Sequence, residues 1–301
     1  MTIHHRVSRT NSTPVATTFT ARPVSPFLGA EIEGIDLARP LNETQVAELR
    51  TALGHYGVLF FRDQDFDFES QKRFGRLFGE LDIHPNTPGP EAHPEVLPIH
   101  ADANSKIIAG ERWHSDVSCF AAPPLGSILH LRIVPETGGD TLFASSAAAF
   151  DALSAPLRSF LIGLTATHSG ERNYRRRNSI LGVDDRGRTF PSAVHPVVIR
   201  HPISDRPSLF VNRLFTARIN ELSESESDAL LEFLFNHAEQ PDFQIRFRWA
   251  PDSVAFWDNR AVQHLAIWDY FPQTRSGSRV TIKGESLAAA GLRARHAGGT
   301  E

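Results

Sequence analysis

The chain has 301 residues, 41% of them hydrophobic, and a formal net charge of −4 at pH 7. This length provides a large buried core, and the mildly acidic balance gives no reason to expect a nucleic acid or an anionic membrane as partner. Cys119 is the single cysteine, which excludes an intrachain disulfide and is typical of a reducing compartment. No stretch reaches the roughly 20 apolar residues of a membrane-spanning helix, and residues 1–23 lack a signal-peptide core. We therefore expect a cytoplasmic protein.

The N-terminal part is predicted to contain a disordered lead followed by alternating strands and helices. Residues 1–20 are rich in Thr, Ser, Asn and Pro, so little of this lead is expected to be buried. Asn42 and Gln45 form a capping-box pattern, which predicts the beginning of a helix. Apolar periodicity predicts the remaining elements: a strand and turn at 27–35, a helix to about residue 54, a buried strand at 58–61 and a helix at 69–78.

The next segment, residues 82–109, contains five prolines and is predicted to be a long loop. Long loops inside compact domains are usually functional. Beyond it, a turn at Gly138-Gly139 separates two predicted strands, and two helices follow. The strands are expected at 127–134 and 141–144, and the helices at 147–153 and 157–164.

Residues 170–191 are rich in Arg, Asn, Asp and Gly, and four of the arginines lie between positions 172 and 177. Most such runs are solvated loops, and this is our structural prediction. Because the segment has few core-forming residues, its local stability is expected to be low. We predict that it acts as a lid that becomes ordered over a bound substrate and excludes water.

The C-terminal part is predicted to be mainly strands around one long helix. Ser223 and Glu226 form a second capping box, and an apolar stripe at helical spacing follows it. Short β-like segments are expected at 197–200, 209–211, 244–249, 253–257 and 279–283. Many short strands with few helices indicate a mainly β fold, a barrel or jelly roll with flanking helices. We expect a single domain over 21–287 and a flexible tail over 288–301.

Arg112-Trp113-His114-Ser115-Asp116 places an imidazole and a carboxylate two residues apart. In an extended segment, residues i and i+2 project to the same side, so both can reach one ion. His264 is the third ligand that we select. Two histidines and one carboxylate form the facial set of non-heme Fe(II) oxygenases, which keeps coordination positions open for substrates. A chance pairing of His and Asp is the alternative interpretation.

Several further motifs lie between and after these three residues in the sequence. They are Gly138-Gly139-Asp140-Thr141, Trp257-Asp258-Asn259-Arg260, Gln263-His264, Arg275 and Arg279. With them, residues 24–285 resemble the taurine dioxygenase family of Fe(II)- and 2-oxoglutarate-dependent oxygenases, which includes alkylsulfatase-like members. The resemblance implies a double-stranded β-helix, a cupin-like jelly roll. It also implies an enzyme that uses Fe(II), 2-oxoglutarate and O2 to hydroxylate an unactivated carbon.

The resemblance also implies roles for the surrounding residues. Arg275 matches the clamp for the far carboxylate of 2-oxoglutarate, which a guanidinium binds bidentately, and Thr141 matches the hydroxyl that shares this carboxylate. A surface ion pair is the alternative for Arg275. Asp258 and Asn259 are interpreted as residues of the turn before His264 and not as catalytic groups.

The positions that hold an anionic head group in sulfonate and sulfate ester members correspond to His84 and Arg279. The peptide N–H of Val117 would complete this site, and Phe215 matches a phenylalanine that lines the substrate pocket. Hydroxylation of the carbon bearing the head group would give an aldehyde plus sulfite or sulfate. We therefore expect a small anionic organic substrate, most simply a sulfonate or an alkyl sulfate ester.

Two positions depart from taurine-specific members. Thr87 and Gly110 stand where those members have a tyrosine and an asparagine, so a larger or less polar anion than taurine is expected. An aryloxyalkanoate carboxylate is the nearest alternative substrate. A metal-binding regulator or a zinc hydrolase is the alternative of a different class, and the Arg275 and Thr141 clamp argues against a hydrolase. We also expect a homo-oligomer.

Overall fold

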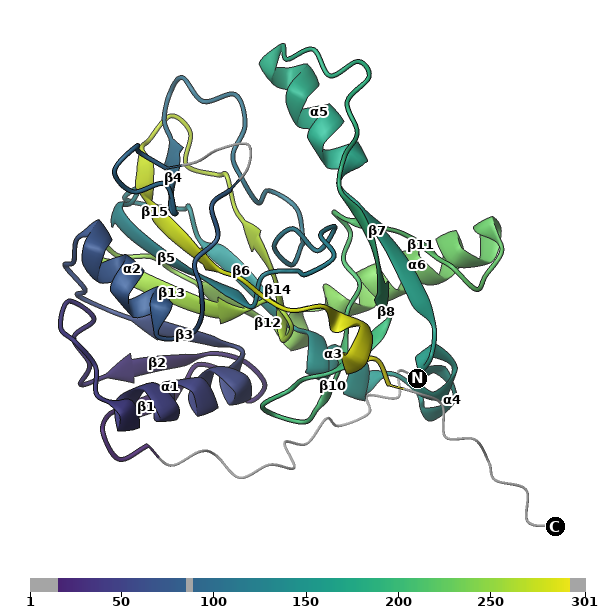
Figure 1. Ribbon diagram of the computed structural model, residues 1–301, viewed down its shortest axis with the longest axis horizontal. Helices are drawn as coiled ribbons and strands as arrows, with labels where there is room; N and C mark the ends of the chain where they lie inside the picture. Colours follow the sequence, from purple (N-terminus) through teal and green to yellow (C-terminus); the bar gives the residue numbers. More distant parts are fainter. Residues whose placement is uncertain (1–15, 85–88, 293–301) are drawn as a thin grey trace.

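Two mainly antiparallel sheets stacked on each other form the centre of the fold in the computed structural model, which describes residues 16–84 and 89–292 (Figure 1). The major sheet contains, in spatial order, β1 (Thr20–Pro23), β2 (Ala30–Glu33), β3 (Val58–Phe61), β13 (Ser253–Asp258), β5 (Gly126–Ile133), β15 (Arg275–Ile282) and β4 (Val96–Ala101). The minor sheet contains β12 (Gln244–Phe247), β6 (Thr141–Ser145) and β14 (Val262–Ala266). In these two sheets, β2 and β3 pair in parallel and the other described neighbours pair antiparallel.

The space between the two sheets is filled by apolar side chains from both. Phe60 of β3 stacks on Phe247 of β12 with ring centroids 3.9 Å apart, and Phe143 of β6 contacts the same cluster. All six residues of β13 are buried, as expected for a strand in the middle of a covered sheet. The predicted double-stranded β-helix is thereby confirmed.

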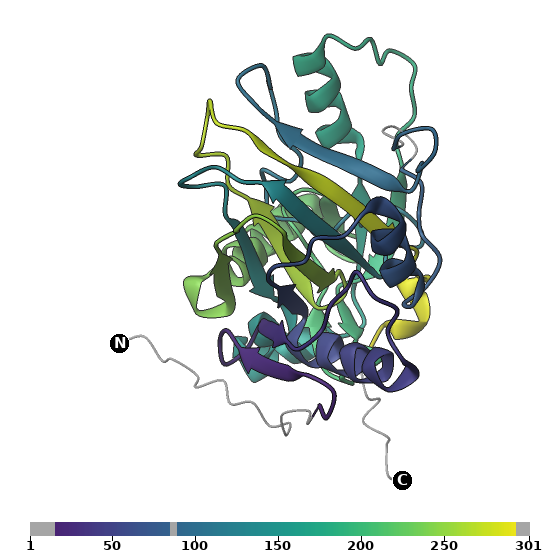
Figure 2. The same cartoon turned by 90° about the vertical axis from the view of Figure 1, so that its left-hand side faces the viewer.

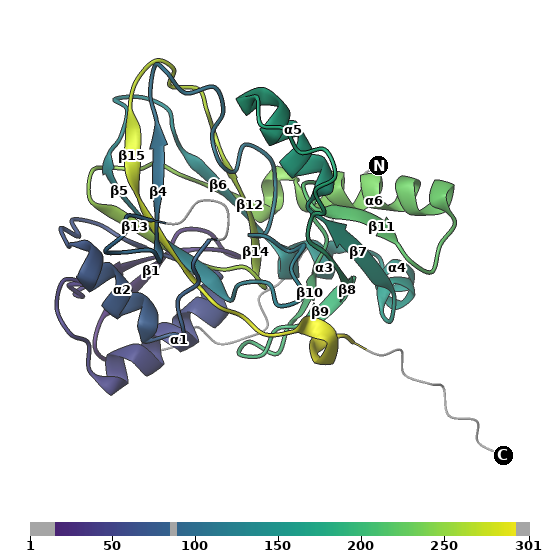
Figure 3. The same ribbon diagram turned by 45° about the horizontal axis from the view of Figure 1, so that its top comes forward.

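Two helices cover the outer face of the major sheet, α1 (Glu43–Tyr56) and α2 (Phe68–Arg76) (Figure 3). The predicted capping box at the beginning of α1 is confirmed, because the Asn42 side chain accepts from the N–H of Gln45 and the Gln45 side chain accepts from that of Asn42. Helix α1 ends where Gly57 adopts a φ of 74° and donates its N–H to the carbonyl of Leu53. No helix in the described ranges has the length and apolar content needed to cross a bilayer.

The other side of the molecule carries smaller sheets and helices α3, α4 and α6 (Figure 3). Its elements are β7 (Thr165–Ser169), β8 (Ser192–Pro196) and β11 (Thr216–Ile219), β9 (Val198–Arg200) with β10 (Pro207–Leu209), and α3 (Ser146–Ala152), α4 (Ala155–Leu161) and α6 (Glu224–Ala238). The predicted capping box of Ser223 and Glu226 begins α6. Short 3-10 helices occur at η1 (Pro241–Phe243) and η2 (Leu287–Ala290).

The prediction of a loop over 170–191 was wrong, because residues Glu171–Leu181 form helix α5. This helix connects β7 to β8 and projects from the end of that strand pair (Figure 2). No residue of α5 is fully buried, so its apolar content was too low to reveal it. An Arg175–Glu171 ion pair at i, i+4 stabilises the exposed face.

The prediction of a loop over 82–109 was also wrong in part, because Val96–Ala101 form strand β4. Strand β4 is at the edge of the major sheet. Pro98 has no N–H to donate, and on the open side of an edge strand this causes no loss of a hydrogen bond to a neighbouring strand. The described parts of the predicted lead and tail, residues 16–20 and 288–292, are held to the fold, and the remainder of both segments lies outside the described residues. Thr17 and Thr18 donate to the carboxylate of Glu48, and the N–H of Leu292 donates to the carbonyl of Val198.

Candidate active site

The three predicted metal ligands lie together on adjacent backbone segments. His114 and His264 form an isolated antiparallel β-bridge, with N···O distances of 3.1 and 2.8 Å between their peptide groups. The chain turns directly after Asp116, at Val117, whose φ is 35°, and the carboxylate of Asp116 lies opposite both imidazoles. Oδ1 of Asp116 is 3.7 Å from Nε2 of His114 and 3.8 Å from Nε2 of His264.

The protonation states of this triad suit a divalent cation. Burial lowers the pKa of both histidines, and Nδ1 of His114 lies 2.7 Å from the carbonyl of Arg112, which leaves Nε2 free to coordinate. Burial opposes ionisation of Asp116, but the charge of the Arg279 guanidinium, together with the two histidines and the Ser127 hydroxyl, outweighs it and holds the pKa of this carboxyl below its usual range. Two neutral imidazoles and one carboxylate whose donor atoms lie within 4.8 Å of one another fit a 2-His-1-carboxylate iron site.

Three further residues orient Asp116. Ser127 donates its hydroxyl to Oδ2 of Asp116 at 2.8 Å, and Nε1 of Trp257 donates to the same oxygen at 3.2 Å. The peptide N–H of Asp116 donates to Oδ1 of Asn259 at 3.1 Å. The sequence prediction therefore missed a supporting role of Asn259, although the Asx turn predicted at Asp258 is present, since its Oδ1 accepts from the N–H of Arg260.

Arg275 is a buried guanidinium beside this triad. Its Nε donates to the carbonyl of Gly139 at 3.0 Å, and Nη2 lies 3.4 Å from the hydroxyl of Thr141, which also accepts from Nε1 of Trp249. Burial lowers the pKa of Arg275 to about 10. Among the residues that the structure describes, no carboxylate lies within salt-bridge distance of Arg275, so the surface ion pair considered for it is absent there.

The turn at Gly138-Gly139 allows this approach. Both glycines have positive φ, and a Cβ at Gly139 would lie 3.3 Å from Cδ of Arg275. The N–H of Gly139 donates to Asp269 at 2.8 Å, which holds the turn in place. The Gly-Gly-Asp-Thr motif thus positions both the carbonyl that orients Arg275 and the hydroxyl of Thr141.

A single cavity of about 630 Å³ contains all nine predicted site residues. Its lining includes the predicted metal ligands, cosubstrate residues and substrate residues: His114, Asp116 and His264; Thr141 and Arg275; His84, Val117, Phe215 and Arg279. Gly110 also lines it, and a Cβ there would lie 3.1 Å from the ring of His114, so this glycine leaves room beside a metal ligand. Thr87 lies outside the described residues.

Two of the predicted substrate residues, Arg279 and His84, have surroundings that the sequence did not reveal. Nη1 of Arg279 donates to Oδ1 of Asp116 at 2.8 Å, so this side chain faces both the triad and the cavity. Burial, and then the charge of Arg279, lower the pKa of His84 and favour its neutral form. Helix α5, which was predicted as a loop, also lines the cavity with Asn173, Tyr174 and Arg177.

The comparisons with known proteins agree with this geometry. The family described as "Taurine catabolism dioxygenase TauD, TfdA family" matches residues 20–281. The chain is 36% identical to an alpha-ketoglutarate-dependent sulfonate dioxygenase of Saccharomyces cerevisiae, covering 88% of this chain and 66% of the yeast protein. It is also 36% identical to an alpha-ketoglutarate-dependent sulfate ester dioxygenase of Pseudomonas putida, covering 90% of this chain and 92% of that protein.

A solved structure supports the same assignment. It is described as a putative alpha-ketoglutarate-dependent taurine dioxygenase from Burkholderia xenovorans, and it superposes with a TM-score of 0.78 at 37% identity. The match covers 89% of this chain and 93% of that one. The chain therefore belongs to the taurine dioxygenase (TauD/TfdA) family of Fe(II)- and 2-oxoglutarate-dependent dioxygenases.

Proposed function

We propose that this protein uses 2-oxoglutarate and O2 to hydroxylate the carbon next to the anionic head group of a small organic sulfonate or alkyl sulfate ester. The observation that carries the proposal is the single cavity that holds the His114, Asp116 and His264 triad, the buried Arg275 and the Arg279 guanidinium. The relatives in Saccharomyces cerevisiae and Pseudomonas putida, whose names contain sulfonate and sulfate ester, favour a sulfur anion as substrate.

The metal would be held by His114, Asp116 and His264, and Fe(II) bound there would supply the activation of dioxygen. The protein's own part is orientation. Ser127 and Trp257 fix the carboxylate through its Oδ2, which leaves Oδ1 directed toward the two imidazoles. We infer that no side chain needs to act as a general acid or base.

For 2-oxoglutarate, Arg275 and Thr141 would hold the carboxylate that lies away from the metal. Arg275 is buried and has no ion-pair partner among the described residues, so an anionic ligand would stabilise its charge. Its planar guanidinium can donate two parallel hydrogen bonds to one carboxylate. The ring of Trp249, 5.5 Å from Cζ of Arg275, supports the guanidinium from one side. This arrangement would direct the 2-oxo acid end toward the triad.

For the substrate, Arg279 and the neutral imidazole of His84 would donate to the anionic head group. A tetrahedral sulfonate or sulfate offers three oxygens to these donors and to the N–H of Val117, whereas a planar carboxylate offers two. Hydroxylation next to the head group inserts one oxygen atom of O2 into the C–H bond. The adduct then loses sulfite or sulfate with a proton and leaves an aldehyde, while 2-oxoglutarate takes the other oxygen and becomes succinate and CO2.

A substrate screen tests this proposal. Taurine, medium-chain alkanesulfonates, alkyl sulfates and aryloxypropionates would be compared for succinate release, with sulfite, sulfate and phenol measured in parallel. We expect a medium-chain sulfur compound to exceed taurine in kcat/KM. Phenol release from an aryloxypropionate, with no turnover of any sulfur compound, would overturn the substrate class and leave the iron site intact. Absence of succinate release with every substrate would favour the non-oxygenase alternative.

The head-group site has a matched pair of variants. His84→Ala should lower kcat/KM about tenfold to a hundredfold, because a hydrogen bond to a charged group contributes roughly 1.5–3 kcal/mol. His100→Ala is the control, since His100 lies on the edge strand β4, is half exposed and is absent from the cavity lining. Equal activity of the two variants would show that His84 does not bind the head group.

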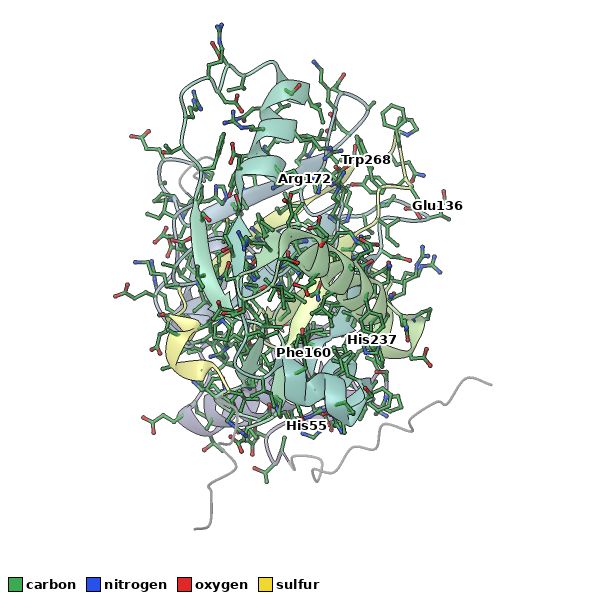
Figure 4. All side chains as sticks on the ribbon, turned by 90° about the vertical axis from the view of Figure 1, so that its right-hand side faces the viewer. His55, Glu136, Phe160, Arg172, His237 and Trp268 are labelled. Carbon is green, nitrogen blue, oxygen red and sulfur yellow. The ribbon has the colours of Figure 1, made fainter. Side chains whose placement is uncertain are left out.

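We further propose a cytoplasmic homo-oligomer. The buried free Cys119 is compatible with a reducing compartment. Phe160 of α4 and Phe233 of α6 are 49% and 48% exposed, and they supply apolar surface for contact with a second copy (Figure 4 labels Phe160). Sedimentation of the purified protein at several concentrations measures the assembly state, and a monomer at every concentration would contradict the proposal.

A further inference from the structure

We propose that Arg177 of helix α5 is a third side chain of the head-group site formed by His84 and Arg279, and that it couples α5 to the bound substrate. This inference rests on the proposed function and deepens it. It identifies a specificity-determining residue outside the motifs that the sequence singled out. It also assigns to the site a preference for a tetrahedral anion whose three oxygens share the negative charge.

The placement of Arg177 is the first argument. On α5, the cavity is lined by Asn173, Tyr174, Arg176, Arg177, Asn178 and Leu181, most of which recur at the spacing of one helix face. The base of this face is packed, because Gly170 lies against Tyr174 and Cys119, and the ring of Tyr174 stacks on Phe190 at 6.0 Å. The inner face of α5 is therefore held against the cavity beside the metal-binding loop.

The ion pairs of α5 are the second argument. Arg175 pairs with Glu171 and Asp185 at 2.9 and 3.3 Å, and Arg176 pairs with Glu111. Arg177 has no carboxylate within salt-bridge distance among residues 16–84 and 89–292, although its side chain is only partly exposed. An unneutralised guanidinium that lines a cavity is suited to bind an anionic ligand.

The charge distribution of the cavity is the third argument. Two carboxylates, Glu111 and Asp116, face a larger set of guanidinium groups: Arg112, Arg176, Arg177, Arg188, Arg275 and Arg279. The pKa of His84 is lowered by its burial and by the charge of Arg279, and also by the charge of Arg177. Arg177 and Arg279 therefore act electrostatically on the same imidazole, and both side chains line the cavity together with His84.

The consequence is a site with donors for each oxygen of a sulfonate or sulfate. His84, Arg279 and Arg177 belong to three different segments, and a tetrahedral anion between them would connect α5 to the strands of the major sheet. Binding of the anion and positioning of α5 over the cavity would then be linked, because each stabilises the other.

The test measures binding apart from turnover. Protein loaded with Fe(II) and 2-oxoglutarate under anaerobic conditions would be titrated with 1-hexanesulfonate and with hexyl sulfate by calorimetry. Arg177→Gln should raise the Kd about tenfold to a hundredfold and leave the affinity for 2-oxoglutarate within twofold. Arg172→Gln is the matched control, because Arg172 lies at the N-terminal end of the same helix, is exposed and is absent from the cavity lining (Figure 4).

A second readout separates a binding role from a structural one. Anion binding should slow hydrogen exchange in residues 171–181 of the wild-type protein and of Arg172→Gln, but not in Arg177→Gln. Arg177→Lys, which keeps the charge, should recover part of both effects, and it preserves the test if the glutamine variant is unstable. Unchanged Kd and unchanged slowing in Arg177→Gln, with sulfur turnover present, would overturn the role of Arg177 alone. A wild-type protein that neither binds nor oxidises these anions would overturn the proposed function and this inference together.

Discussion

Nη1 of Arg279 lies 2.8 Å from Oδ1 of Asp116, so the guanidinium assigned to the substrate head group also contacts the carboxylate of the metal triad. Arg279 is largely buried, and its Nε has no hydrogen-bond partner among the described residues. One arginine thus joins the proposed metal site to the proposed substrate site, and substrate and metal are expected to influence each other through it.

The first prediction concerns this arginine. Arg279→Gln should lower kcat/KM for the sulfur substrate on the order of a hundredfold, because a charge-assisted hydrogen bond to the head group is lost. The substitution also removes the positive charge of Arg279 next to the buried Asp116 carboxylate. A bound metal cation can replace that charge. The drop in Tm should therefore be larger without metal than with Mn(II). Equal drops under both conditions would contradict the coupling.

The second prediction concerns the cosubstrate. Arg275→Gln should raise the Kd for 2-oxoglutarate about thirtyfold or more, since removing one partner of a buried charge pair costs on the order of 2–5 kcal/mol. Metal affinity should change little, because Arg275 makes none of the described contacts with the triad. Anaerobic titration of the Fe(II)-loaded protein measures both quantities. An unaltered affinity for 2-oxoglutarate would refute the clamp assignment.

The third prediction concerns the metal triad. Anaerobic addition of Fe(II) and 2-oxoglutarate to the wild-type protein should produce a weak visible charge-transfer band. His264→Ala should abolish it, because His264 supplies one of the three ligand atoms that lie within 4.8 Å of one another. His237→Ala is a suitable control, since His237 on α6 contacts the carbonyl of Ala149 and does not line the cavity (Figure 4). A band of wild-type intensity in His264→Ala would exclude this ligand.

The fourth prediction concerns the segment 170–191 as a lid. The segment contains α5, whose residues are all partly or fully exposed, so its local stability is expected to be low in the absence of ligands. Hydrogen exchange here should slow when 2-oxoglutarate and substrate are both present. Slow exchange already in the protein without ligands would show that the segment is a fixed part of the fold.

The fifth prediction concerns pH and stability. Burial, together with the nearby His195, lowers the pKa of His168 to about 3, whereas a histidine in an unfolded chain has a pKa of about 6.5. As the pH falls between these values, the unfolded chain binds a proton that the folded protein does not. The free energy of unfolding should therefore decrease by about 1.4 kcal/mol per pH unit from this group, and the loss should be absent above pH 7.

Urea unfolding of the wild-type protein and of His168→Gln between pH 8 and pH 5 measures this effect. His168 contacts the hydroxyls of Ser118 and Thr216 at 2.9 and 3.3 Å, so the variant should be less stable at pH 8. Its stability should fall less steeply below pH 6.5, because one buried imidazole no longer contributes. Parallel curves for the two proteins would show that the pKa of His168 is not lowered by folding.

Features that depend on local chemistry could be predicted from the residues alone. The capping boxes at Asn42 and Ser223 were correct because a helix cap involves side chains only three residues apart. The spacing of His114 and Asp116 indicated the metal site because two ligands on one short segment need no knowledge of the fold. The role of Arg275 was found through the resemblance, since its distance in sequence from the triad carries no geometric information.

Contacts between distant segments required the folded chain. Strand β4 with Pro98 exists because it pairs with β15 at an open edge, and the amide of Asn259 supports Asp116 because β13 brings it there. The contact of Arg279 with Asp116 and the position of Arg177 on the cavity side of α5 depend in the same way on long-range packing. The sequence thus specified which chemical groups are present and which helices they can cap. Strand register and sheet stacking, which arise from interactions over the whole chain, determined which of those groups meet in one cavity.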